Sequence, residues 1–299
     1  MSKMNKGYIK IFFSLLSVFI YVNDKTLATE PSPGNVTLDK FVKSALPNDE
    51  SNKGHEQNNT LLCTDPEETE KATKLMNIAV SLLQYHGTNT DNYDLITDLD
   101  FDTNLYFKKH ENADIEKLNF KIRNPDKYND IVNKLWNPHG DQYYDENFIN
   151  GKIVRVYNPN LIMIQQHYKN PTQLSPKYAY ALATKVEISK DTTIMVCGST
   201  NINDHNNSNQ KAYINTISEI ADSLKIDIDS EEGIKQEELE KKFVNLSGFI
   251  IKKDNELIDI TYVSSMHVNA PFVPMFINRL IKASKLIVLM HLKNVFYNV

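Results

Sequence analysis

Motifs that mark common enzyme classes are missing from this 299-residue chain. It has no GxSxG nucleophile elbow, no phosphate-binding P-loop, no HExxH zinc motif and no group of Cys and His at metal-ligand spacing. Cysteine is scarce, and the two that follow the N-terminal segment are Cys63 and Cys197. Such a pair fits one disulfide and two free thiols equally well. We therefore expect no enzyme, no cofactor and no bound metal.

Excess positive charge and long apolar runs are also lacking. The formal net charge is −5 and the isoelectric point is near 5.9, whereas proteins that bind nucleic acid usually have a basic face. We therefore expect no nucleic-acid partner. Mean hydropathy is −0.44, which excludes a protein with many membrane spans. The apolar share of 41% is still ample for a large core.

An apolar run covers residues 11–22, directly after a basic stretch. It is too short for a membrane span, which needs about 20 apolar residues, but it has the length of a signal-peptide core. Thr26 and Ala28 supply small side chains for a cleavage site. We expect residues 1–28 to be a signal peptide and the protein to be secreted. Pro, Ser, Asn and charge dominate residues 29–61, which predicts a disordered polar spacer.

A folded domain is expected over residues 62–299, and its first element is predicted to be a helix. Asp65 is placed as the N-cap, Pro66 fits the first helical position, and Glu68 stands where a capping box has an acid. Gly87 is suited to close the helix. One apolar stripe recurs at helical spacing: Leu75, Ile78, Ala79, Leu82 and Leu83.

The remaining elements predict an α+β fold, in which a curved antiparallel sheet has helices at both ends. The expected strands are residues 93–110, 115–125, 150–159, 160–171, 177–189 and 192–200, followed by a hairpin over 243–265. The further expected helices are residues 126–136, 208–224 and 270–296. Residues 227–242 are expected to be a solvated charged stretch.

Asp98, Asp100 and Asp102 alternate along the first predicted strand. A calcium loop would need a glycine at Thr103 and a glutamate at Lys109, so the pattern does not fit one. In a strand the three carboxylates share one face. A solvated face of the sheet is therefore the favoured interpretation.

Aromatic, amide and cationic side chains recur on single faces of the predicted strands. Alternation places Arg155 with Ile153 and Tyr157, and it places Tyr178 with Tyr180, whereas the alanines between them face the other way. Such a mixture suits a cavity for an amphiphile, which is mostly apolar with a few polar groups. An exposed polar face of an ordinary sheet explains the same pattern equally well.

The last predicted helix has a broad apolar stripe that includes Phe272 and Phe276, with lysines elsewhere. Its uncharged runs, the nine residues 270–278 and the seven residues 286–292, are too short to span a membrane. Packing against the sheet explains the stripe. Closing a hydrophobic tunnel, with lysines directed toward an anionic membrane surface, is the functional interpretation, and the two are compatible.

The order of these elements resembles the START (StAR-related lipid transfer) domain. The segment "LWNP" at residues 135–138 ends the internal helix, where that family has a similar Trp followed by Asn or Asp. The later strands follow in the family's order, and Asn278 matches within the Pro-led last helix. The likeness covers about residues 67–296. It implies a helix-grip fold, in which a curved antiparallel sheet around a long C-terminal helix encloses a lipid tunnel.

Nearly the whole chain resembles the fam-a multigene family of rodent malaria parasites. The N-terminal segment carries this likeness together with "LLCTDPEETEKATKLMN", "KIVRVYNPNLIMIQQHYK", "NINDHN" and "DIDSEE". The family comprises secreted START-domain proteins and is associated with phosphatidylcholine transfer and with export into the host erythrocyte. The resemblance thus implies the parasitophorous vacuole or the host erythrocyte as destination. Lys25 and Thr29 depart from the export motif RxLx[EDQ].

In the phosphatidylcholine-transfer branch of the START family, aromatic side chains surround the choline, as a quaternary ammonium prefers. By this resemblance Tyr178 matches one cage position and Phe243 another, while Ile164 stands where the cage has Trp. Three charged positions of the family are uncharged here: Asn133, Asn137 and Gln165. The resemblance therefore does not determine which headgroup is bound. The position of Arg155 on its predicted strand face suggests it as the cation for a phosphate.

Together these patterns predict a secreted protein that carries a phospholipid between membranes. The expected phospholipid is phosphatidylcholine, and the protein is expected to contact each membrane surface transiently. The residues expected to line the lipid site are Trp136, Arg155, Tyr157, Gln165, Tyr178, Tyr180, Phe243, Phe272 and Phe276. The alternative is a START shell without transfer activity, which serves as an interaction or surface protein where host and parasite meet.

Overall fold

The computed structural model describes residues 61–100, 102–110, 113–169, 176–206, 215, 221, 223–230, 234, 239–266, 291 and 295–296. The predicted signal peptide and spacer lie outside this range, except for residue 61. So do most of the predicted helix at 208–224 and nearly all of the predicted C-terminal helix, with Phe272 and Phe276. Among the described residues, no helix has the length and apolarity that a membrane span requires.

Helix α4 (Pro66–Thr88) opens the described part of the chain. The Asp65 side chain caps it as predicted, because Oδ1 accepts hydrogen bonds from the backbone N–H groups of Glu67 and Glu68 at 2.8 and 3.2 Å. The predicted capping box is not formed. The carboxylate of Glu68 is instead hydrogen-bonded to side chains of a strand, as described below.

Two glycines lie where α4 crosses the sheet. Gly87 was predicted to close the helix but lies inside it, and a Cβ there would be 2.5 Å from Ile250 Cδ1. A Cβ on Gly248 would lie 2.2 Å from the carbonyl oxygen of Met195 and 2.9 Å from Leu83 Cδ2. Gly248 therefore requires glycine, because a Cβ there would meet backbone atoms, whereas a Cβ at Gly87 would meet only the end of a side chain.

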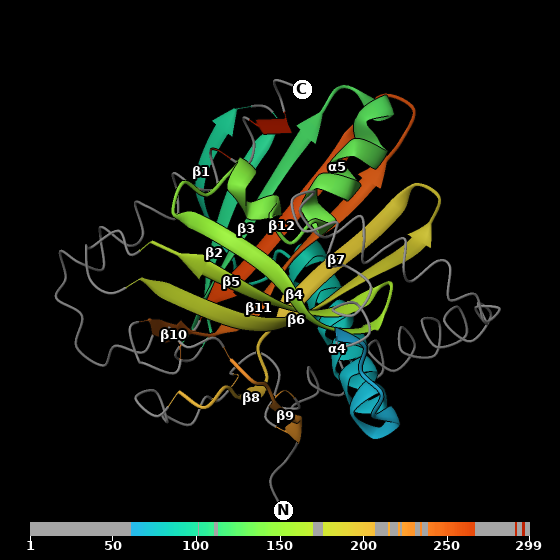
Figure 1. Cartoon of the computed structure of the whole chain (residues 1–299). Helices are drawn as coiled ribbons and strands as arrows, with labels where there is room; N and C mark the ends of the chain where they lie inside the picture. The colour runs from blue at the N-terminus through green and yellow to red at the C-terminus, as the bar shows by residue number, and fades with distance from the viewer. Residues whose placement is uncertain are drawn as a thin grey trace, which may run out of the picture.

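The main sheet has ten strands within the described residues, and nine of them form the path β1-β2-β3-β12-β11-β7-β6-β5-β4. Their bounds are β1 (Asp94–Asp100), β2 (Thr103–His110), β3 (Ala113–Ile122), β4 (Phe148–Asn158), β5 (Leu161–Tyr168), β6 (Lys177–Ser189), β7 (Thr192–Gly198), β11 (Val244–Lys253) and β12 (Ile258–Met266). All pairs along this path are antiparallel. In Figure 1 the strands run in clearly different directions at the two ends of the sheet, as in a strongly curved sheet. The predicted α+β class with a curved antiparallel sheet is confirmed.

Three short strands lie outside that path. Strand β10 (Glu240–Lys242) pairs in parallel with β6, and β8 (Asn201–Asn203) pairs in parallel with β9 (Lys225–Asp227) as a separate small sheet. The predicted solvated stretch at residues 227–242 is therefore wrong in part. Three of its side chains are buried against the sheet: Ile228, Ser230 and Ile234.

The segment predicted as one strand at residues 93–110 is two strands, β1 and β2, joined by a tight turn. Asp98 pairs with Asn104, and Asp100 pairs with Thr103. The chain turns between them because Asp and Asn favour turns over strand interiors. Asp102 lies in the turn and not in a strand, so the prediction that all three aspartates lie along one strand was wrong. Asp102 accepts a hydrogen bond from Arg123 Nη2 at 2.8 Å.

Three short helical segments connect β3 to β4. They are η2 (Pro125–Lys127), α5 (Tyr128–Trp136) and η3 (Gly140–Tyr143). Trp136 is the last residue of α5, as predicted from the sequence. It is half-buried against apolar side chains of α5 and of the neighbouring strands.

Each face of the sheet has its own core. On the face that we call the α4 face, helix α4 packs against side chains that include Met163, Leu182, Ile194 and Ile250. On the opposite α5 face, side chains of α5 pack together with strand residues and with the C-terminal Phe296, for example Ile131, Phe249 and Ile251. A second cluster on the α5 face comprises Ile153, Val156, Ile162, Ile164, Ala181 and Ala183.

Candidate functional site

The two faces of β6 differ in side-chain size, as the alternation predicted. Tyr178 and Tyr180 belong to the core of the α4 face, whereas Ala181 and Ala183 belong to the α5 face. Neighbouring β5 follows the same division, since Met163 lies on the α4 face and Ile162 on the α5 face. Both faces of both strands are therefore buried.

Strand β4 departs from simple alternation. Its register with β5 shifts between Ile153 and Arg155, which marks a β-bulge. As a result Ile153 packs on the α5 face while Tyr157 packs on the α4 face. The prediction that Arg155 shares a face with Ile153 was wrong, because a bulge inverts the parity of the residues beyond it.

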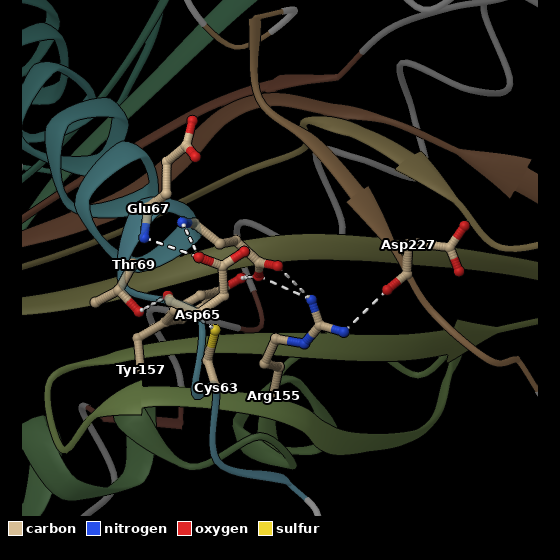
Figure 2. A network of polar contacts seen from close by, with 8 residues as sticks. Cys63, Asp65, Glu67, Thr69, Arg155, Tyr157 and Asp227 are labelled. Carbon is tan, nitrogen blue, oxygen red and sulfur yellow. Dashed lines mark hydrogen bonds and ion pairs between the residues drawn. The ribbon is translucent and has the colours of Figure 1, made fainter.

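Arg155 and Tyr157 join the beginning of α4 to the sheet (Figure 2). Arg155 Nη1 donates to both carboxylate oxygens of Glu68 at 2.8 Å, and Tyr157 Oη donates to Glu68 Oε1 at 2.6 Å. On its other side, Arg155 Nη2 donates to the carbonyl oxygen of Asp227 at 2.9 Å. The guanidinium expected to bind a phosphate is thus engaged by the chain itself.

Tyr178 takes part in a second polar network on the α4 face. Its hydroxyl donates to Asp204 Oδ2 at 2.8 Å and accepts from Asn206 Nδ2 at 3.1 Å. Lys241 Nζ lies 2.8 Å from the same Asp204 oxygen, and both side chains are almost fully buried. Because β10 carries Lys241 and the segment after β8 carries Asp204, this ion pair holds both segments against β6.

Tyr180 and Gln165 are linked beside this network. Gln165 Nε2 donates to the Tyr180 hydroxyl at 3.1 Å, and the Tyr180 and Ser230 hydroxyls are 2.8 Å apart. The rings of Tyr178 and Tyr180 meet edge to face, with centroids 5.9 Å apart. The aromatic and amide groups expected at the site therefore bind one another.

The seven predicted site residues that the structure describes do not gather around one space. The structure brings Arg155 together with Tyr157, and Gln165 together with the two tyrosines of β6, all on the α4 face. Trp136 lies on the α5 face. Phe243 is buried at the beginning of β11, with Lys241 Nζ 5.6 Å from its ring centroid. Phe272 and Phe276 lie outside the described residues.

A row of small side chains crosses the α5 face. Ala183 of β6, Cys197 of β7, Ser247 of β11 and Ser264 of β12 are consecutive partners across four neighbouring strands. We call them the small-residue row. The next row on this face is large, with Met195, Phe249 and Tyr262 as consecutive partners. The row was missed from the sequence, although the alternating alanines of β6 were its signal.

A carboxylate with polar neighbours lies on the same face, beside β5. Asp141 of η3 accepts hydrogen bonds from the hydroxyls of Tyr144 and Tyr168, the latter at 2.7 Å, and from Gln166 Nε2 at 3.2 Å. Loss of solvent raises the pKa of the Asp141 carboxyl, and the three donors oppose that shift. Sequence reasoning did not identify this group, because η3 carries no strand or helix periodicity.

Neither cysteine forms a disulfide. Cys63 and Cys197 are free thiols, which answers the question that the sequence left open. Burial, with the nearby carboxylate of Asp141, raises the pKa of Cys197 to about 12. This thiol therefore stays protonated at neutral pH and is a poor nucleophile.

Other kinds of site are poorly represented in the part of the chain that the structure describes. It contains no group of three His, Cys, Asp or Glu side chains that could hold a metal ion. A groove of about 280 Å³ lies at the beginning of α4, lined mainly by charged side chains such as Glu67, Lys71 and Lys225. That lining does not suit an acyl chain.

One solved structure shows the same fold, and two others are similar to it. Human StAR-related lipid transfer protein 5 aligns with a TM-score of 0.53 and 9% identity, over 77% of this chain and 97% of that chain. The human StarD13 (DLC2) lipid transfer and protein localization domain aligns with a TM-score of 0.49 and 12% identity, over 73% of this chain and 95% of that chain. Human STARD10 aligns with a TM-score of 0.48 and 11% identity, over 71% of this chain and 77% of that chain. No family model and no curated protein matches the sequence. The first likeness confirms the predicted START helix-grip fold, and at this identity it shows the fold alone.

Proposed function

We propose that this protein binds a phospholipid on the α5 face of its sheet and carries it between membranes. The observation that carries the proposal is the small-residue row, because four small side chains in register take up less volume than the row of Met195, Phe249 and Tyr262 beside them. A site of this kind, mostly apolar with a few polar groups, suits an amphiphile. Hiding an acyl chain there would gain about 0.8 kcal/mol per buried CH₂.

Phosphatidylcholine is the lipid that we propose first, and secretion is the route. Both rest on the sequence: the resemblance to fam-a proteins supports the lipid, and residues 1–28 have the pattern of a signal peptide. The same resemblance supports the parasitophorous vacuole or the host erythrocyte as destination. One solved structure with this fold is a protein named for lipid transfer, which agrees with carriage rather than catalysis.

Extraction of lipid from the purified protein tests this function. We expect a stoichiometric phospholipid in the extract, and we expect the protein to move labelled phosphatidylcholine from donor to acceptor liposomes. Ala183→Phe should lower both bound lipid and transfer at least several-fold, since an aromatic ring would fill the small-residue row. Ala183→Ser keeps the volume and should behave like the wild type. A lipid-free wild-type protein that transfers nothing would contradict the proposal.

A second function is an interaction protein built on the START fold, without transfer. The commitment of Arg155 to Glu68 favours it, because that strand cation is not free to bind a phosphate. Asn133 and Asn137 favour it too, since they are uncharged and exposed. The two functions separate in the liposome assay: the interaction protein would retain its fold and show no transfer.

A further inference from the structure

Two exposed apolar side chains lie in one short segment of the surface. In the described part of the chain, the large apolar side chains that are well exposed are Leu62, Leu95, Tyr143 and Ile149. Tyr143 is the last residue of η3 and is 40% exposed, while Ile149, near the beginning of β4, is 49% exposed. We call residues 143–149 the η3–β4 segment. Apolar side chains exposed singly are common, whereas a group of them marks a contact surface.

The fold holds the η3–β4 segment in place between its two exposed side chains. Phe148 N donates to the carbonyl oxygen of Asp145 at 3.0 Å, and Lys169 N donates to that of Asn147 at 2.7 Å. The second bond ties the segment to the end of β5. The rings of Tyr144 and Phe148 are buried beneath the segment. The exposure of Tyr143 and Ile149 is therefore a property of an ordered part of the surface.

Charged side chains of both signs surround the exposed pair. Lys134 Nζ stands 5.4 Å from the ring centroid of Tyr143, and Lys169 is exposed beside the segment. Within the segment, Glu146 is exposed and Asp145 is half-buried. A surface with both signs of charge complements a zwitterionic layer better than a strongly anionic one.

A tyrosine beside a lysine suits the headgroup layer of a bilayer. Tyr rings collect at that level because the ring is apolar and the hydroxyl remains in water. A lysine stem lies along apolar surface while its ammonium group reaches the phosphates. Ile149 adds an aliphatic side chain that gains by leaving water. The composition of the segment therefore favours a lipid surface as its partner.

We propose that the η3–β4 segment docks this protein on the surface of a zwitterionic phospholipid bilayer, with Tyr143 and Ile149 inserted among the headgroups. The inference rests on the proposed carriage of lipid between membranes and adds the surface through which a membrane is reached. Tyr144 of the segment belongs to the core of the α5 face, so docking here brings the proposed lipid site to the bilayer. Apolar insertion supplies the binding, and anionic lipid is not required.

Sedimentation of the purified protein with phosphatidylcholine vesicles tests this assignment. We expect Ile149→Ser to lower the partition coefficient about tenfold or more, the loss for one buried aliphatic side chain, and Tyr143→Ser to lower it several-fold. Leu95→Ser is the matched control and should leave it unchanged, because Leu95 is 54% exposed on β1, at the other end of the sheet from β4. Raising the salt from about 0.05 to about 0.5 M should change wild-type binding by less than about twofold.

A fluorescence measurement covers the case in which a serine variant does not fold. Tyr143→Trp keeps an aromatic ring at the surface, and brominated phosphatidylcholine should quench its emission once the signal of Trp136 in the wild type is subtracted. Leu95→Trp should not be quenched.

Several results would overturn the docking surface. These are a vesicle-bound Tyr143→Trp protein without quenching, folded serine variants with wild-type partition, and a wild type that binds anionic vesicles alone. A wild type that binds no vesicles would also overturn it and would favour a protein partner for the exposed pair. A protein that docks as expected but contains and transfers no lipid would overturn the proposed function and leave the docking surface intact.

Discussion

His86 is a buried base at the end of α4. Its Nδ1 lies 2.9 Å from the hydroxyl of Tyr93. Burial lowers its pKa from 6.5 to about 4, with smaller contributions from Lys108, His110 and Lys117. Lys117 is itself buried, donates to the carbonyl oxygen of Asn89 at 2.8 Å and stands over the Tyr93 ring. The end of α4 therefore packs against the positively charged Lys117, and the buried ring of His86 stays neutral there.

We predict that this histidine makes the fold sensitive to mild acid. Above pH 6.5 the ring is neutral in both states. Between pH 6.5 and about 4 the unfolded chain binds a proton that the buried ring does not, so the free energy of unfolding falls as pH falls. The loss should approach about 3 kcal/mol at pH 4. Urea unfolding at a series of pH values should show a flatter profile for His86→Gln than for the wild type.

At the scale of elements, the bidentate contact of Arg155 with Glu68 ties helix α4 to strand β4. The side chains are 24% and 16% exposed, so water screens the pair less than it screens a surface ion pair. The adjacent Glu67 pairs with Lys71 at 2.6 Å, with side chains 74% and 54% exposed. Of these two neighbouring glutamates, Glu68 thus forms a largely buried ion pair and Glu67 an exposed one.

We predict that Glu68→Gln lowers the free energy of unfolding by about 1.5–3 kcal/mol, the contribution of a hydrogen bond to a charged group. Glu67→Gln should change it by no more than about 0.5 kcal/mol. Thermal denaturation followed by circular dichroism measures both. Equal shifts in the two variants would mean that the Arg155 contact adds nothing to the stability of the fold.

Most elements were predictable because each has a local signal. Strand β6 begins at Lys177 and ends at Ser189, as its alternation indicated, and α5 ends at Trp136 before Pro138. The site was less predictable. Both faces of β5 and β6 are buried, so the contrast between polar and apolar residues no longer tells which face is open to a ligand. The bulge after Ile153 is a tertiary feature without a local sequence mark, and it inverted the reading of β4.

At the scale of the whole molecule, residues 1–28 have the sequence pattern of a signal peptide. We predict that a secretory host releases a mature protein whose first residue is Thr29. Edman sequencing or intact mass measures this directly. Ala28→Arg should block cleavage, because the processing enzyme requires a small residue there. Ala28→Ser should be cleaved normally. An uncleaved wild-type chain would contradict the signal-peptide assignment.

The order of strands in the sheet has a consequence for how the chain folds. Strands β1 to β3 form one ribbon and β4 to β7 form another, and the hairpin of β11 and β12 joins them. Until synthesis passes residue 266, the last of β12, both ribbons have an unpaired edge, β3 on one and β7 on the other. Pairing across such sequence separations makes folding slow, and exposed edges invite association between chains. A nascent chain of this protein therefore depends on its last hairpin for protection from aggregation.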